Sequence, residues 1–229
     1  KIDLIIKLYK KNNFMISYNE TISVIRRAIR YEISKNLSVV KTSDGRLDSA
    51  VNENMYLRNI SHFIQSEYTN IDIVVPNVRF WYDIKINNIP FNLKLSSGGT
   101  DNAFSKSSII YTLLGTEYSK KVNYNDWINI IKNGSIKKTR NRLTEYQYIT
   151  IFKNSGDFLV KSLIDIHTYK SNPSNILQIN WKNELKNEEY ETINYSEKIK
   201  EMLKTVQNSI LIHFNNSNTF LNEDFSFIE

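Results

Sequence analysis

The chain has 229 residues, of which 41% are hydrophobic and 24% charged, and it carries a net charge of +6. This length and composition favour a single globular domain over residues 1–229, and no apolar stretch approaches the roughly 18 residues of a membrane span. The absence of cysteine excludes disulfides and thiolate metal sites and favours a reducing, cytoplasmic location, while the basic charge favours nucleic acid over a membrane as a partner.

The first third of the chain predicts two helices. Ser17–Glu20 has the spacing of a capping box, and isoleucine recurs every three or four residues from Ile22 to Ile33 on one face of the helix that follows. Thr42–Gly45 predicts a turn, and Asp48 is the expected N-cap of a second helix that ends near Gln65.

The middle of the chain changes to the two-residue period that is typical of strands. Ile71–Val75 is a β-branched run that is closed by Pro76. Arg79–Ile86 and Phe91–Leu95 are expected to pair as a hairpin around a turn at Asn87-Asn88.

The second half of the chain alternates between helical and strand patterns. A loop of small residues at Ser96–Thr100 precedes a helix that we expect Asp101 to cap and Gly115 to end. The remaining expected elements are a helix at Asn125–Ile131, strands at Tyr146–Phe152, Phe158–Ile166 and Ile176–Trp181, and a helix at Asn194–Phe214 with Ile199, Leu203, Val206 and Ile210 facing inward. Together these elements predict an α/β fold with a mixed central β-sheet flanked by helices.

The expected hairpin brings together three polar side chains. Asp83 lies four residues before the turn and Asn92 lies four residues after it. Lys94 follows Asn92 by two residues and should project from the same face of its strand. A carboxylate, an amide and an ammonium group can therefore converge at one edge of the sheet, as the hydrolysis of a phosphodiester requires.

A second acid is needed, because one carboxylate binds Mg²⁺ weakly. Glu53 is the candidate, since it shares a helical stripe with Leu57, Ile60 and Ile64 that should face the sheet. An inward-pointing carboxylate is costly unless it has a partner or a metal ion. The alternative is that all of these polar residues are ordinary solvated surface residues.

The segment resembles the PD-(D/E)xK core of type II restriction endonucleases, in which an acid on one strand is followed by a turn and an acid-x-Lys tripeptide. Asp83 matches the first acid, Asn92-Leu93-Lys94 matches the tripeptide and Glu53 matches an acid on the preceding helix. Further segments similar to restriction enzymes that carry Asn in the tripeptide are Leu95–Lys106, Tyr111–Gly115 and Asn172–Ile179.

The resemblance implies a restriction-endonuclease-like core, similar to the blunt-cutting EcoRV-like branch, and a homodimer that cleaves double-stranded DNA at a short palindromic site. Mg²⁺ would be the cofactor, with Asp83, Glu53 and the carbonyl of Leu93 as its ligands. Asn92 would orient the metal or its water, and Lys94 would polarise the phosphate and the attacking water.

Two departures from the family pattern leave alternatives open. Asn92 replaces the usual acid of the tripeptide, and Tyr82 stands where proline often precedes the first acid. One alternative is a non-catalytic nucleic-acid-binding protein on a degenerate nuclease scaffold, and another is a repair or junction nuclease with the same core.

Residues that could contact DNA fall into two groups. The loop after Lys94 and the helix that follows it contribute Ser96, Ser97, Asn102 and Lys106. A basic run contributes Lys137, Lys138, Arg140 and Arg142, although such runs are commonly solvated loops.

Overall fold

A computed structural model describes residues 17–35, 45–76, 80–102, 105–118, 122–174 and 176–221. The chain forms two compact units, the first made of residues 1–95 and 147–160 and the second of residues 96–146 and 161–229. The single domain expected over 1–229 stays a prediction, because compactness alone does not decide whether each unit folds independently. Of the expected elements, most of the turn at residues 42–45 and the start of the strand at residue 79 lie outside the described residues.

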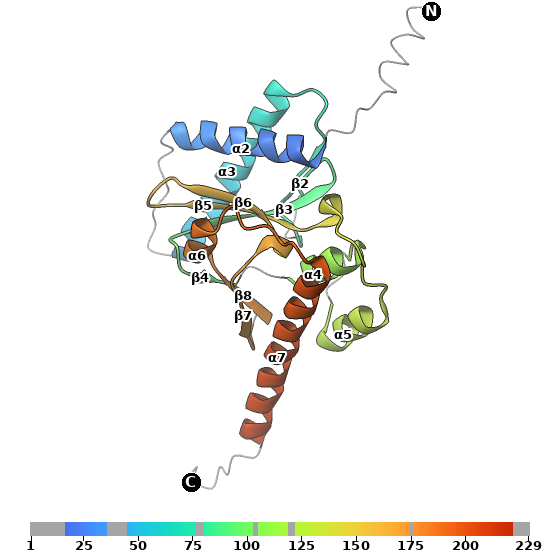
Figure 1. Cartoon of the computed structure of the whole chain (residues 1–229). Coiled ribbons are helices and arrows are strands. Elements are labelled where there is room, and N and C mark those ends of the chain that lie inside the picture. Colours follow the sequence, from blue (N-terminus) through green and yellow to red (C-terminus); the bar gives the residue numbers. More distant parts are fainter. Residues whose placement is uncertain are drawn as a thin grey trace, which may run out of the picture. The chain divides into compact units, whose positions relative to one another are not determined.

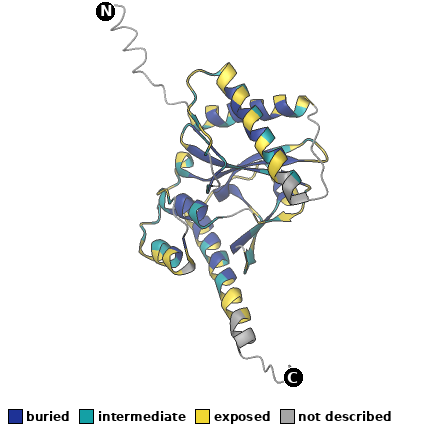
Figure 2. Cartoon of the chain, turned by 180° about the vertical axis from the view of Figure 1, so that it is seen from behind, coloured by how far each residue is buried: buried dark blue, intermediate teal, exposed yellow. Residues whose placement is uncertain are grey.

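The first unit is built on a five-stranded sheet with the strand order β1-β2-β3-β5-β6. Its elements are α2 (Tyr18–Ser34), α3 (Gly45–Glu67), β1 (Ile73–Val74), β2 (Ile84–Ile86), β3 (Ile89–Ser96), β5 (Gln147–Phe152) and β6 (Phe158–Ser162). Helices α2 and α3 lie together over the sheet, and the buried side chains of both helices join those of β2, β3, β5 and β6 in one hydrophobic core (Figure 1). Their outer faces are exposed (Figure 2). The mixed α/β character is as predicted.

The capping box at the start of α2 is confirmed. The Ser17 hydroxyl accepts a hydrogen bond from the Glu20 backbone N–H at 3.2 Å, and the Glu20 carboxylate accepts one from the Ser17 N–H at 2.7 Å. Ile25 and Ile29 on the predicted face are fully buried. The second helix begins at Gly45, so Asp48 lies in its first turn and is not the N-cap that we expected.

The predicted hairpin is also confirmed, although β2 is shorter than expected. Asn87 and Asn88 form its turn with φ angles of 49° and 65°, the left-handed conformation that Asn tolerates better than most residues. The side chain of Asn87 joins the hairpin to its surroundings. It accepts a hydrogen bond from the Asp72 N–H at 3.1 Å and donates one to the Thr21 hydroxyl at 3.0 Å.

The second unit contains a three-stranded antiparallel sheet with the order β4-β8-β7. Its elements are β4 (Thr100–Asp101), α4 (Lys106–Leu114), α5 (Tyr124–Asn133), η1 (Arg142–Thr144), η2 (Leu163–Asp165), β7 (Tyr169–Asn172), β8 (Ile176–Asn180), α6 (Trp181–Lys186) and α7 (Tyr195–Leu221). Helix α7 packs along β7 and β8 at its N-terminal half (Figure 1). Ser209 of α7 anchors this contact, because its hydroxyl accepts from the Asn172 N–H at 3.0 Å and donates to the Ile176 carbonyl.

Local hydrogen bonds correct two of the predicted boundaries. Asp101 lies in β4, and α4 is instead capped by Ser105, whose hydroxyl accepts from the Ser108 N–H at 3.1 Å. The strand expected over Phe158–Ile166 ends at Ser162, because the Ser162 hydroxyl caps the 3₁₀ turn that follows. Gly115 does end α4, in the left-handed conformation with φ of 73°.

Two further predictions for the second unit need correction. Trp181 begins α6 and does not extend the strand, because the side chain of Asn180 caps that helix. In α7 the buried stripe includes Met202 and Ser209, whereas Leu203 and Ile210, which we expected to face inward, are only partly buried. Within the described residues, no helix is long and apolar enough to cross a membrane.

Candidate metal and catalytic centre

The candidate centre lies in the first unit, where β3 continues past the end of β2. The pairing of these strands reaches Ile84 opposite Phe91, and the Asp83 N–H still donates to the Phe91 carbonyl at 2.9 Å. Beyond this point the N–H groups of Leu93 and Leu95, which point to the same side of β3 as that of Phe91, have no β2 residue opposite them. Carboxylate side chains accept the hydrogen bonds that a longer β2 would otherwise accept from these N–H groups.

Asp83 and Glu53 supply these two carboxylates. The Leu93 N–H donates to Asp83 Oδ2 at 2.8 Å, and the Leu95 N–H donates to Glu53 Oε1 at 3.3 Å. Glu53 comes from α3, which the sequence predicted to present this face to the sheet. One strand segment therefore holds two acids that are 30 positions apart in the chain.

Asn92 completes the cluster and leaves one polar atom unsatisfied. Its amide nitrogen donates to Asp83 Oδ2 at 2.7 Å. Its amide oxygen Oδ1 is buried and has no hydrogen-bond partner among the described residues. A buried acceptor without a donor is costly and rare, so this oxygen is suited to a ligand that the chain itself does not supply.

Lys94 lies on the same side of β3 as Asn92, as predicted. Both side chains are partly exposed, whereas Leu93 and Leu95, which alternate with them, are buried in the core. Burial raises the pKa of Asp83 above its ordinary value, and the hydrogen bond from Leu93 and the positive charge of Lys94 oppose that rise. An acid that burial makes hard to ionise gains most from a bound cation.

The donor atoms fit a hard divalent cation. Two carboxylates, one amide oxygen and the Leu93 carbonyl are all oxygen ligands, which Mg²⁺ prefers. The described part of the chain contains no group of three or more His, Asp or Glu side chains placed to hold a metal, so a zinc-like cluster is not present there. A site with two acids leaves coordination positions for water and a phosphate oxygen.

The loop residues predicted to contact DNA lie in the second unit and differ from one another in exposure and in hydrogen bonding. Ser97 is exposed, whereas Ser96 is buried and its hydroxyl accepts from the Gly98 N–H at 2.9 Å. Asn102 is exposed, and its side-chain oxygen accepts from Gln178 at 3.1 Å. The ammonium group of Lys106 donates to the Val122 carbonyl at 3.1 Å.

The basic run Lys137–Arg142 divides into buried and exposed members. Lys137 donates to the carbonyl and the hydroxyl of Thr144, each at 2.9 Å, and burial lowers the pKa of Lys137 to about 8. Lys138 is exposed. Arg142 pairs with Glu191 at 2.7 Å near the surface.

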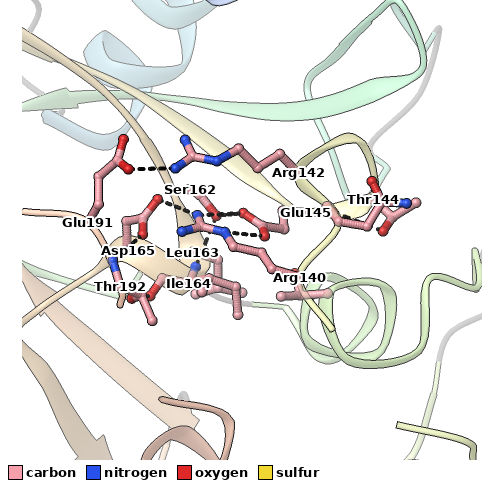
Figure 3. Close-up of polar contacts among 12 residues, drawn as sticks. Arg140, Arg142, Thr144, Glu145, Ser162, Leu163, Ile164, Asp165, Glu191 and Thr192 are labelled. Carbon is pink, nitrogen blue, oxygen red and sulfur yellow. Dashed lines mark hydrogen bonds and ion pairs between the residues drawn. The ribbon is translucent and has the colours of Figure 1, made fainter. Parts of the chain in front are cut away.

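Arg140 is held in a network of buried acids that the sequence did not predict (Figure 3). Its guanidinium binds both oxygens of Glu145, at 2.9 and 3.1 Å, and one oxygen of Asp165 at 2.5 Å. Burial lowers the pKa of Arg140, but the bonds to the two acids outweigh this effect and raise it overall. The only signal in the sequence was an acid five residues after the arginine, a spacing too common to be informative.

Comparisons with family models, with curated proteins and with solved structures found no match for this chain. The resemblance to PD-(D/E)xK nucleases therefore stays a prediction from the sequence.

Proposed function

We propose that this chain is a magnesium-dependent endonuclease of the PD-(D/E)xK type that cleaves double-stranded DNA at a short palindromic site. The observation that supports this most is the convergence of Asp83, Glu53 and Asn92 on one segment of β3, together with the buried Oδ1 of Asn92, which has no partner among the described residues. Lys94 adds a positive charge next to the acids.

A cation bound at this centre would neutralise charge on the scissile phosphate and make bound water more acidic. Asp83, Glu53 and the Leu93 carbonyl would hold it, and Asn92 would orient it through Oδ1. Lys94 would donate a hydrogen bond to the phosphate or to the attacking water. Water adds to phosphorus and the bond to the 3′ oxygen breaks, which leaves 5′-phosphate and 3′-hydroxyl ends as in the family that the hairpin resembles.

The structural alternative is that the acids only cap the unpaired N–H groups of β3. This alternative accounts for one oxygen of Asp83, because both hydrogen bonds to that acid arrive at Oδ2. It does not account for the buried Oδ1 of Asn92 or for a carboxylate whose burial raises its pKa. A bound cation would compensate both costs at once, which favours a metal centre over a strand cap.

The DNA-contacting surface that we propose is smaller than the sequence predicted. Ser97, Asn102 and Lys138 are exposed, and the partly exposed Arg142 pairs with an exposed glutamate, which costs little to replace with phosphate. Arg140 and Lys137 already have partners inside the second unit. We further propose a homodimer, because a palindromic duplex site has the two-fold symmetry of a dimer.

Cleavage of a sequenced bacteriophage DNA tests the proposal. Wild type should yield discrete fragments with Mg²⁺ and none with EDTA. Lys94→Ala should lower the cleavage rate by about 100-fold or more, the usual effect of removing one group that stabilises transition-state charge.

Lys85→Ala is the matched control, because Lys85 belongs to the same hairpin but points its ammonium group toward the Tyr82 ring. It should cleave within a few-fold of wild type. Binding without cleavage by wild type on several DNAs would instead support the non-catalytic alternative, and cleavage of branched DNA only would support a junction nuclease.

A further inference from the structure

Unit one contains a cavity of about 320 Å³ between α2 and α3 that the proposed nuclease reaction does not use. Its lining residues lie within Tyr31–Lys35, at the C-terminal end of α2 and its cap, and within Asn59–Glu67 on α3. This volume lies at the lower end of the range for small-molecule sites, so the ligand it suits is small.

Glu32 is one of the residues that line this cavity, and its carboxylate is incompletely satisfied. Glu32 is only 1% exposed, and its Oε1 accepts a hydrogen bond from the Lys35 ammonium at 2.9 Å. Its other oxygen, Oε2, is buried and has no partner among the described residues. A buried carboxylate oxygen without a donor is costly, so a donor from outside the chain would stabilise it.

The lining also has an unbalanced charge. Glu32 and Glu67 contribute two carboxylates and Lys35 contributes one ammonium, which leaves a formal charge of −1 when His62 is counted as neutral. The hydrogen bond to Glu32 raises the pKa of Lys35, so that ammonium stays charged. The cavity can therefore take one further positive charge.

The aromatic side chains of the lining favour an organic cation. The rings of Tyr31 and Phe63 pack at a centroid distance of 4.6 Å and offer apolar surface to methylene groups. Tyr31 already accepts a cation, since the ammonium of Lys35 lies 4.0 Å from its ring centroid.

We infer that the cavity between α2 and α3 binds a small aliphatic primary amine, of the alkyl diamine class, whose ammonium group donates to Glu32 Oε2. Its methylene groups lie against Tyr31 and Phe63. The second amino group of a diamine extends toward Glu67, which is exposed at the rim. This inference is independent of the proposed nuclease activity.

Isothermal titration calorimetry of the full chain with putrescine tests the inference. Wild type should bind one putrescine saturably, and 1-butanol, which lacks the charge, should neither bind nor compete. Glu32→Gln keeps an oxygen for Lys35 but puts an amide nitrogen in place of Oε2, so putrescine should bind about tenfold to hundredfold more weakly. Glu67→Gln should weaken binding only a few-fold, because this acid is solvated.

Glu197→Gln, which removes an exposed acid on α7, is the control and should leave putrescine binding unchanged. The absence of saturable binding by wild type overturns the inference whether or not any variant folds. Equal affinity of Glu32→Gln and wild type overturns it as well. Competition by 1-butanol would indicate an apolar pocket, and displacement of putrescine by Mg²⁺ at equal concentration would indicate a cation site of a different kind.

Discussion

Two polar clusters in this molecule use similar residues but differ in whether their buried oxygen atoms have hydrogen-bond partners. In the second unit, Arg140 lies between Glu145 and Asp165 (Figure 3). Glu145 Oε2, which Arg140 also binds, accepts from the Ser162 hydroxyl at 2.5 Å, and the second oxygen of Asp165 accepts from the Thr192 N–H at 2.8 Å. In the first unit, Asp83 and Asn92 meet on β3, but the buried oxygen of Asn92 has no donor among the described residues.

The proposed function predicts this difference, because a structural network needs no ligand and a metal centre does. A cluster in which every charge has a partner is costly to break, because removing one member leaves a buried charge uncompensated, and it has no remaining donor or acceptor for a ligand. A cluster with a buried oxygen and an acid that is hard to ionise stays costly until a cation enters. Three changes would test this contrast.

The largest effect on stability should come from Arg140→Met. Its loss leaves two buried carboxylates without a counter-charge, so we expect the free energy of unfolding to fall by about 3–5 kcal/mol in urea titrations. Arg142→Met is the matched control, because it removes an exposed pair with Glu191 and should cost about 0–1 kcal/mol. Equal losses for both variants would show that the buried network has no special role.

The next effect should come from Asp83→Asn, which should lower cleavage by about 100-fold or more while leaving the fold intact. Burial raises the pKa of Asp83, so the folded protein without metal holds a proton on this acid more tightly than the unfolded chain does. The protonated carboxyl of Asp83 therefore contributes to the stability of the folded state. This contribution is fully present below the pKa of the unfolded chain and is lost as pH rises through the raised pKa of the folded state. In EDTA at neutral pH the variant should therefore unfold at a higher urea concentration than wild type, and this difference should vanish in acid.

Mg²⁺ provides the complementary measurement on the same pair of proteins. Excess Mg²⁺ should raise the unfolding midpoint of wild type and leave that of Asp83→Asn unchanged, because only the native wild-type centre binds it. A variant that is less stable than wild type in EDTA would show that Asp83 serves the fold, as Arg140 does.

The smallest effect should come from Lys138→Gln. Lys138 is exposed beside buried basic residues, so we expect weaker DNA binding by a few-fold and a salt-dependence slope reduced by about 1. Lys137→Gln should leave that slope unchanged and lower stability, because Lys137 donates its hydrogen bonds to Thr144. A reduced slope for Lys137→Gln and an unchanged slope for Lys138→Gln would show that DNA contacts Lys137 and not Lys138.

Local features were predictable from the sequence because short-range physics decides them. The capping box at Ser17, the left-handed turn at Asn87-Asn88 and the end of α4 at Gly115 each depend on residues within four positions. The approach of Asp83 to Asn92 was equally predictable, since a two-residue turn sets the register of the hairpin. Half of the candidate centre therefore follows from one stretch of chain.

Long-range packing decided the features that the sequence did not predict, namely the contacts of Glu53 and of Arg140. Glu53 reaches the Leu95 N–H only because α3 packs on the sheet. The Arg140 side chain is buried only because the fold places Asp165, which is 25 residues away in the sequence, within hydrogen-bond distance of it. A basic run has the same sequence whether its charges face water or buried acids, and only tertiary contacts fix that choice, because the cost of burying a charge depends on the partners present. The sequence by itself determined the hairpin and its polar residues, and the tertiary structure decided which of the charged residues remain available to a ligand.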